Sequence, residues 1–137
     1  MTEARANLAA MEAIDDAWNR RDWAAYGGFL ADDLVALNAG RTQGRAEHVA
    51  DAQALCARFP DATVRLPYLD VFASEDGTRT VSVARLTGTD PASGRAFDVG
   101  FCVICTWRGG RIVAQRQFVD TETLRRQLGA PSEGSPA

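Results

Sequence analysis

The sequence predicts an α+β domain in which helices precede an antiparallel sheet and lie on one of its faces. Apolar residues recur at helical spacing early in the chain, where segments 3–20, 23–30 and 44–58 are expected to be helices. From residue 62 the sequence instead shows strand-like runs separated by turn residues. Because the helices come first and the strands then follow one another as a meander, the helices should cover one face of the sheet.

The first helix is indicated by an apolar face, and the second by a capping residue. In segment 3–20 the apolar face is formed by Leu8, Met11, Ile14 and Trp18. Asp22 precedes segment 23–30, where its side chain can accept hydrogen bonds from the free N–H groups of the first helical turn. The third helix, 44–58, is rich in alanine and is expected to end near Pro60.

The strands are predicted from apolar runs that end at turn residues. A short strand over 34–38 stops before Gly40, and a strand over 62–74 is joined to its partner, 79–89, by the hairpin turn Asp76-Gly77. The remaining predicted segments are the turn 90–94, the strand 95–108, the turn 109–110, the strand 111–119 and the closing helix 122–128.

Length and charge are those of a single globular domain with no nucleic-acid partner. The 137 residues suffice for one core, assigned to residues 1–129, and the polar segment 130–137 is expected to be a disordered tail. The net charge is −3 and the 15 basic residues, all Arg, are scattered along the chain, which argues against a nucleic-acid surface. No apolar run approaches the roughly 20 residues that span a bilayer, so no membrane partner is expected.

The cysteine and histidine content predicts a reduced, cytoplasmic protein without a metal site. The chain contains three cysteines and one histidine, too few for a Cys/His site to be expected. Cys102 and Cys105 lie three apart in a predicted strand, so their side chains should point to opposite faces. We also predict that the protein needs no cofactor.

The strand over 95–108 predicts a homodimer. Its two faces are both apolar, one carrying Phe97, Val99, Phe101, Val103, Cys105 and Trp107, and the other Gly100, Cys102 and Ile104. An antiparallel strand with one solvated face should alternate apolar and polar residues. We therefore expect the helices to cover one face and a second copy of the chain to cover the outer face of the sheet.

The order and spacing of several motifs resemble the SnoaL-like polyketide cyclases, a family of the nuclear transport factor 2-like superfamily. The motifs are 17–22 (AWNRRD), 29–34 (FLADDL), 44–47 (GRAE), 59–61 (FPD), 86–89 (LTGT), Asp120 and 127–129 (QLG). The resemblance covers about residues 8–129. It implies a cone-shaped, curved, antiparallel or mixed sheet with three N-terminal helices across its concave face, and an enclosed apolar pocket for a small hydrophobic molecule.

Asp120 is the first candidate catalytic residue. By its resemblance to the strand-ending Asp of this family, it would be the general acid/base that removes a proton next to a carbonyl group in ring closure. The alternative is that Asp120 caps the closing helix. Strand alternation places Asp120 on the face opposite Gln115 and Gln117, so it reaches the pocket only if the strand bends or bulges at its end.

Asn38 is the second candidate catalytic residue, because an amide at the end of an apolar strand can hold a substrate carbonyl or enolate. The alternative is a turn residue beside Gly40. The corner resembles that of ketosteroid isomerases, where an Asp base sits, and Asn cannot replace that base. Gln117 is a second candidate for holding the oxygen.

Further residues are candidates for substrate binding. Gln115, Gln117, Tyr68 and Tyr26 could supply polar contacts, Trp18 and Phe29 could form pocket wall or core, and Cys102 and Thr106 occupy positions where related enzymes carry an acid and a His. Cys102 is interpreted as core filler and Thr106 as a strand residue. His48, the single histidine, is expected to be a solvated residue early in the third helix.

Together these residues indicate a SnoaL-like enzyme that cyclises or isomerises a small hydrophobic carbonyl compound by acid/base catalysis. Epoxide opening by a pair of carboxylates, Asp120 and Asp70, is an alternative within the same fold. A binding or dimerisation module without turnover is the alternative outside enzymes, because a fold of this kind does not by itself define a reaction.

Overall fold

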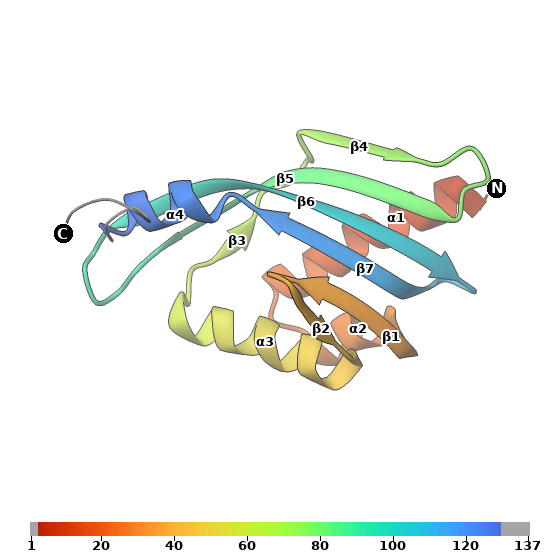
Figure 1. Cartoon of the computed structure of the whole chain (residues 1–137), viewed down its shortest axis with the longest axis horizontal. Coiled ribbons are helices and arrows are strands. Elements are labelled where there is room, and N and C mark those ends of the chain that lie inside the picture. The colour runs from red at the N-terminus through yellow and green to blue at the C-terminus, as the bar shows by residue number, and fades with distance from the viewer. Residues whose placement is uncertain (1–2, 130–137) are drawn as a thin grey trace.

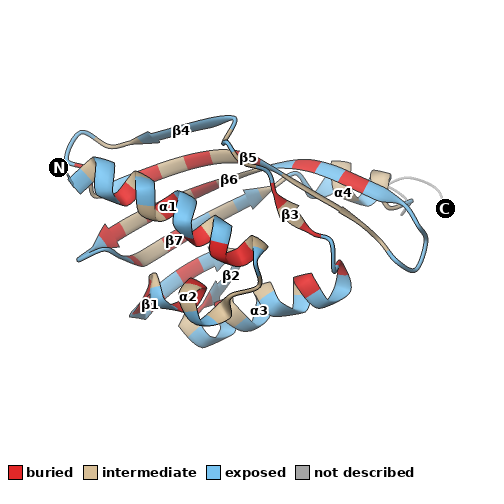
Figure 2. Ribbon diagram, turned by 180° about the vertical axis from the view of Figure 1, so that it is seen from behind, coloured by how far each residue is buried: buried red, intermediate tan, exposed pale blue. Residues whose placement is uncertain are grey.

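The computed structural model describes residues 3–129, in which a layer of helices covers one face of a curved sheet (Figures 1 and 2). The helices are α1 (Glu3–Asn19), α2 (Trp23–Gly28), α3 (Arg45–Arg58) and α4 (Thr121–Gln127). The strands are β1 (Leu30–Asn38), β2 (Arg41–Gln43), β3 (Thr63–Val64), β4 (Asp70–Ala73), β5 (Arg79–Thr89), β6 (Ala96–Arg108) and β7 (Arg111–Val119). This arrangement confirms the predicted α+β class, with three N-terminal helices and a short closing helix.

The sheet is mixed and has seven strands in the described part of the chain. Its order is β2-β1-β7-β6-β5-β3, with β4 also paired to β5. β5, β6 and β7 form the predicted antiparallel meander, whereas β1 runs parallel to β7. This parallel pair brings the N-terminal third of the chain onto the sheet, so that residues of β1 and β7 lie side by side.

The first strand begins earlier than predicted, at Leu30 instead of Leu34. Leu30 is fully buried and opposite Ile112 of β7, and a bulge separates this contact from the regular pairing that resumes at Val35. The acidic residues Asp32 and Asp33 in between are exposed, which is why this stretch lacks an apolar pattern. The short strand β2 was not predicted.

The predicted strand over 62–74 is divided into β3 and β4 by Pro67. Proline has no N–H group to donate to a neighbouring strand, so pairing with β5 is interrupted there. The backbone leaves the sheet after Arg65 and returns at Leu69. This excursion places Tyr68 where its side chain reaches α1.

The core lies between the helices and the concave face of the sheet. Figure 2 shows the buried stripe of α1 facing the sheet, with Met11, Ile14, Ala17 and Trp18 buried in it. Each fully buried Leu, Ile or Met side chain contributes about 1.5–3 kcal/mol relative to leaving it exposed. Phe97, Val103, Cys105 and Trp107 of β6 lie on the inner face as predicted.

Two further observations concern the termini and membranes. Within residues 3–129 no helix is long and apolar enough to cross a bilayer. The predicted disordered tail, 130–137, lies outside the described residues.

Candidate functional site

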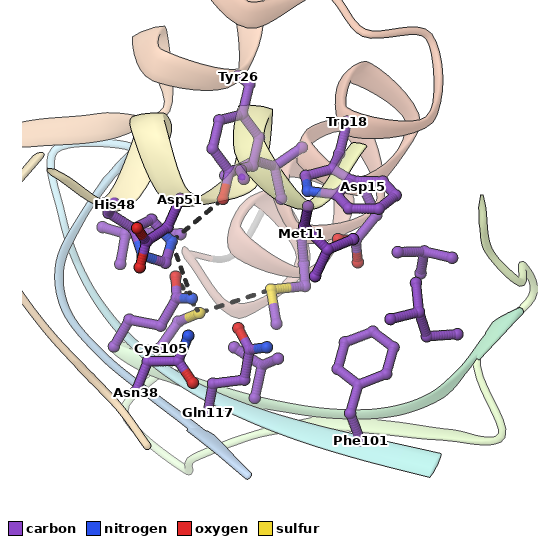
Figure 3. A pocket seen from close by; sticks show the side chains of 18 residues that line it. Met11, Asp15, Trp18, Tyr26, Asn38, His48, Asp51, Phe101, Cys105 and Gln117 are labelled. Carbon is purple, nitrogen blue, oxygen red and sulfur yellow. Dashed lines mark hydrogen bonds between the residues drawn. The ribbon is translucent and has the colours of Figure 1, made fainter. Parts of the chain in front are cut away.

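A small cavity lies between α1, α3 and the concave face of the sheet (Figure 3). Its volume is about 110 Å³. The apolar part of its lining consists of Met11, Ile14, Trp18, Ala52, Leu55, Val64, Leu86, Phe101, Val103 and Ile112. The polar part consists of Asp15, Tyr26, Asn38, His48, Asp51, Cys105, Gln115 and Gln117. A concave, mostly apolar cavity with a few polar groups is the usual form of a small-molecule site.

Asp15 of α1 is the partly buried acid of this cavity. The hydroxyl of Tyr68 donates to its Oδ2 at 2.6 Å and also lies 2.9 Å from the carbonyl oxygen of Met11. Burial raises the pKa of Asp15 from 3.8 to about 6, although the hydrogen bond from Tyr68 opposes this shift. A carboxyl group with such a pKa can both accept and release a proton near neutral pH.

The Tyr68 hydroxyl can form a hydrogen bond with Asp15 in both the ionised and the protonated form of the acid. Tyr68 has one proton but two acceptors, the Asp15 carboxylate and the Met11 carbonyl. When Asp15 is ionised, the hydroxyl proton can be donated to it. When Asp15 carries a proton, Asp15 can donate to Tyr68 while Tyr68 donates to Met11, so both states are hydrogen-bonded.

A second polar cluster lies across the cavity, around His48 of α3. The Tyr26 hydroxyl is 3.1 Å and the Gln115 amide nitrogen 3.3 Å from Nε2 of His48, and Cys105 Sγ lies 3.9 Å from Oε1 of Gln115. Burial lowers the pKa of His48, so the ring is neutral at neutral pH. Both neighbours can then donate to an unprotonated Nε2, whereas Nδ1 has no hydrogen-bond partner within residues 3–129.

Two amides face the cavity from the sheet. Asn38 at the end of β1 lies directly opposite Gln117 of β7 in the parallel pair, and both side chains line the cavity (Figure 3). No hydrogen bond engages either side chain within the described residues, so their N–H and carbonyl groups are available to a ligand.

Asp51 is the exposed member of the cavity lining among the described residues. Its carboxylate accepts hydrogen bonds from Gln43 of β2 and lies 3.5 Å from the guanidinium of Arg41. Because Asp51 is about half exposed, it marks where the cavity meets solvent, with Ala52 and Leu55 further along the same helix face.

Asp120 does not reach the cavity. It lies in solvent as the N-cap of α4, where its Oδ1 accepts from the backbone N–H of Thr123 and its Oδ2 accepts from the Thr123 hydroxyl. These hydrogen bonds lower its pKa, the reverse of what the predicted acid/base role requires. The strand does not bend inward at its end, so the helix-cap alternative describes the observed position.

The other predicted site residues divide into two groups. Gln115, Gln117, Asn38, Trp18 and Tyr26 line the cavity, and Tyr68 acts on it through Asp15. Cys102, Thr106 and Phe29 do not line it.

Strand alternation on β6 explains why Cys102 and Thr106 do not line the cavity, and local packing at the end of α2 explains why Phe29 does not. Because Cys105 faces the cavity, Cys102 and Thr106 point to the outer face. Phe29 ends α2 and packs against the core. Asp70, the proposed partner of Asp120 in epoxide opening, is exposed on β4, so that carboxylate pair is not assembled.

Among the polar lining residues, Asp15, His48, Asp51 and Cys105 were not predicted as site residues. Asp15 lies four residues after Met11 and three before Trp18, so helical spacing places it on the apolar face of α1. His48 is buried instead of solvated, at 5% exposure. It shares one face of α3 with Ala52 and Leu55, at spacings of four and seven residues. Within residues 3–129, no three His, Cys, Asp or Glu side chains gather as a metal site.

Fold and site together define a class of protein, the nuclear transport factor 2-like proteins, in which N-terminal helices enclose a pocket against a curved sheet. The family model of the SnoaL-like polyketide cyclases matches residues 8–128. The chain belongs to this family. No curated protein sequence matches the chain.

Solved structures share the fold over almost the whole chain. A candidate polyketide cyclase from Xanthomonas campestris pv. campestris has a TM-score of 0.84 at 23% identity, covering 93% of this chain and all of its own. IdmH, a candidate polyketide cyclase from Streptomyces antibioticus, has a TM-score of 0.81 at 23% identity, covering 90% of this chain and 99% of its own.

AclR from Streptomyces galilaeus, described as a candidate hydroxylase, has a TM-score of 0.79 at 18% identity, covering 91% of this chain and 97% of its own. Proteins described by different reactions thus share this fold, and the reaction has to be argued from the cavity.

Proposed function

We propose that this protein is a cofactor-independent enzyme that isomerises or cyclises a small hydrophobic carbonyl compound by acid/base catalysis. The observation that carries the proposal is Asp15, a carboxyl group with a pKa of about 6 on the wall of a mostly apolar cavity. Acid/base catalysis works best when the pKa of the catalytic group lies near the working pH. Asp15 takes the place in the mechanism that the sequence had assigned to Asp120.

The first step of the proposed reaction is proton removal from the carbon next to the carbonyl. The ionised Asp15 accepts this proton, and the electron pair of the broken C–H bond forms an enolate on the substrate. Asn38 and Gln117 donate N–H groups to the enolate oxygen from the sheet side of the cavity. In Figure 3 these amides lie across the cavity from Asp15.

The second step returns the proton or forms the new bond. Protonated Asp15 is held by the Tyr68 hydroxyl, which can turn its own proton to the Met11 carbonyl. Return of the proton to a different carbon isomerises the substrate. In ring closure the enolate carbon instead attacks a second carbonyl carbon, the electron pair of that C=O π bond moves to its oxygen as an alkoxide, and protonated Asp15 gives its proton to this alkoxide. The mostly apolar lining of the cavity strengthens the hydrogen bonds to the enolate, because charges and dipoles are screened less there than in bulk water.

The proposal can be tested on its elementary step without the natural substrate. One-ring ketones such as cyclohexanone and acetophenone are incubated with the protein in D2O, and loss of the α-proton signals is followed by NMR. We expect the native protein to accelerate exchange and Asp15→Asn to lose at least about 100-fold of the acceleration. The control variant Asp120→Asn should retain it, because Asp120 caps α4 outside the cavity.

A binding module without turnover is the second candidate, and the position of Asp120 favours it. The residue that most resembles the catalytic Asp of the family serves here as a helix cap. If ketones bind to the native protein but their α-protons exchange no faster than in buffer, the enzyme proposal is wrong and the cavity is a ligand-binding site alone.

A further inference from the structure

The charge of the cavity restricts the ligand it can take. Among the lining residues the two that carry a formal charge are both carboxylates, Asp15 inside and Asp51 at the mouth. In the described part of the chain no Arg lines the cavity, although the protein has 15 of them. A cavity that binds an anion would be expected to present a cation to it.

The two carboxylates differ in how far their charge is balanced. Asp51 lies 3.5 Å from the guanidinium of Arg41, and both side chains are about half exposed, so solvent and Arg41 screen its charge. Asp15 receives a neutral donor, the Tyr68 hydroxyl. A ligand carboxylate would thus meet an unbalanced like charge inside a mostly apolar space, where repulsion is poorly screened.

The polar groups that remain for a ligand are neutral. Asn38 and Gln117 present amide groups from the sheet, and His48 is held neutral by burial. Amides can donate to a carbonyl oxygen and accept from a hydroxyl or N–H group. They can satisfy an uncharged oxygen. A ligand carboxylate, by contrast, would bring an additional charge into the cavity and lose hydration there without a cation in the lining to balance it.

The size of the cavity restricts the ligand further. At about 110 Å³ it is somewhat smaller than an engineered apolar cavity of about 150 Å³ that admits benzene. Phe101 lies at the end of the cavity away from His48 (Figure 3). A single ring is therefore the largest ring system that fits this space, with its polar substituent reaching into the part that opens to solvent at Asp51, whereas fused rings exceed it unless the helices move.

We propose that the cavity takes an uncharged one-ring carbonyl compound, about the size of benzamide, and excludes the corresponding carboxylate. The carbonyl group in this ligand class rests on the proposed function, whereas its charge and size follow from the cavity itself. Binding and exchange are separate measurements, so a failure of this proposal is distinguishable from a failure of the proposed reaction.

The test uses three probes that differ in one property at a time. Benzamide and benzoate have nearly the same shape but differ in charge, and 2-naphthamide adds a fused ring to benzamide. Dissociation constants are measured at pH 8 by ligand-observed NMR titration of the full chain. We expect benzoate to bind at least about tenfold more weakly than benzamide because of like-charge repulsion. We expect 2-naphthamide to gain nothing over benzamide, although its larger apolar area would favour it in an open site.

Substitutions and a change of pH test whether the carboxylates of the cavity cause the preference for benzamide over benzoate. Asp15→Asn should reduce the ratio of the benzoate and benzamide dissociation constants severalfold. Asp51→Asn should reduce this ratio less, and Asp120→Asn should leave it unchanged. The ratio should also fall at pH 5, where Asp15 is protonated in the native protein. The proposal would be overturned if benzoate bound as tightly as benzamide, or if Asp15→Asn left their ratio of dissociation constants unchanged. It would also be overturned if 2-naphthamide bound more tightly than benzamide, or if benzamide did not bind at millimolar concentration.

Discussion

The ionised form of Asp15, which the proposed reaction needs as its base, lowers the stability of the folded protein. Its pKa is 3.8 in an unperturbed chain and about 6 in the folded protein, where burial disfavours the carboxylate. The folded state therefore binds the Asp15 proton more tightly than the unfolded state does. The stability that Asp15 contributes is fully present below about pH 4 and is lost as the pH rises through about 6.

Substitution of Asp15 by Asn should thus stabilise the protein at high pH and leave it nearly unchanged at low pH. Asn keeps an oxygen that can accept from Tyr68 but cannot ionise. The rise in the pKa of Asp15 from 3.8 to about 6 corresponds to about 3 kcal/mol. The stability of Asp15→Asn relative to the native protein should therefore increase by up to about 3 kcal/mol from pH 4 to pH 8. Urea unfolding at both pH values measures this gain.

Asp120→Asn is the matched control, with the opposite sign expected. The folded protein lowers the pKa of Asp120, so the stability from this carboxylate is present at pH 8 and is lost as the pH falls. Asp120→Asn should therefore lose stability relative to the native protein at pH 8. A difference between Asp15→Asn and the native protein that did not change with pH would contradict the burial of an ionisable group at position 15.

The residues of the site were predicted best where strand alternation determines which face they lie on. Gln115 and Gln117 lie on the inner face of β7, and alternation correctly placed Asp120 on the other face. A resemblance to catalytic Asp residues could not decide whether the strand bends inward. Asp15 and His48 were missed because a charged or polar residue on a helix is usually solvated, and burial here depends on Tyr68 and Tyr26 from distant segments.

At the scale of elements, the pairing of β5 with β6 depends on close packing over Gly88. Gly88 lies opposite Phe97, and a Cβ atom added at Gly88 would lie 2.6 Å from the Phe97 ring and 3.3 Å from the backbone of Ala62. The Phe97 ring also contacts Phe59 edge-to-face at 5.0 Å, so it has little freedom to move aside. Glycine at this position lets the end of α3 close over the sheet.

Substitution of Gly88 by Ala should accordingly destabilise the fold by about 1–3 kcal/mol through overpacking. The matched control is Gly100→Ala on the neighbouring strand β6, where an added Cβ meets nothing within 4 Å. That variant should be neutral or slightly stabilised, because Ala loses less conformational freedom on folding than Gly does. Urea unfolding measures the free energy of unfolding of both variants, and equal values for the two would contradict this account of the packing.

Helices and strands that are marked by local sequence patterns were predictable, whereas strands that depend on pairing with a distant part of the chain were not. The helices and the strands β5, β6 and β7 follow from periodicity and from hairpin turns such as Asp76-Gly77. The start of β1 depends on parallel pairing with β7, some eighty residues away, and leaves no pattern in the exposed acidic pair. The division of 62–74 was signalled by Pro67, a signal that the sequence analysis did not use.

At the scale of the whole molecule, the sheet has two apolar faces but helices cover one of them. The inner face holds the cavity. On the outer face the strand registers place Cys102 beside Phe118 and Val83, and Ile104 beside Val81 and Arg116. Phe118 is 55% exposed, and Leu37 and Phe72 extend the apolar face to β1 and β4.

We propose that a second copy of the chain covers this outer face, as the two-sided apolarity of β6 predicts. A symmetric dimer would bury Phe118 near the middle of the interface, so Phe118→Glu should dissociate it. Val71→Glu is the control, because Val71 is an exposed apolar residue that pairs with the buried Ser82 and so lies on the other face of the sheet. Sedimentation velocity over a range of concentrations should show a dimer for the native protein and for Val71→Glu, and a monomer for Phe118→Glu. A native protein that sediments as a monomer at every concentration would show that the outer face is left to solvent.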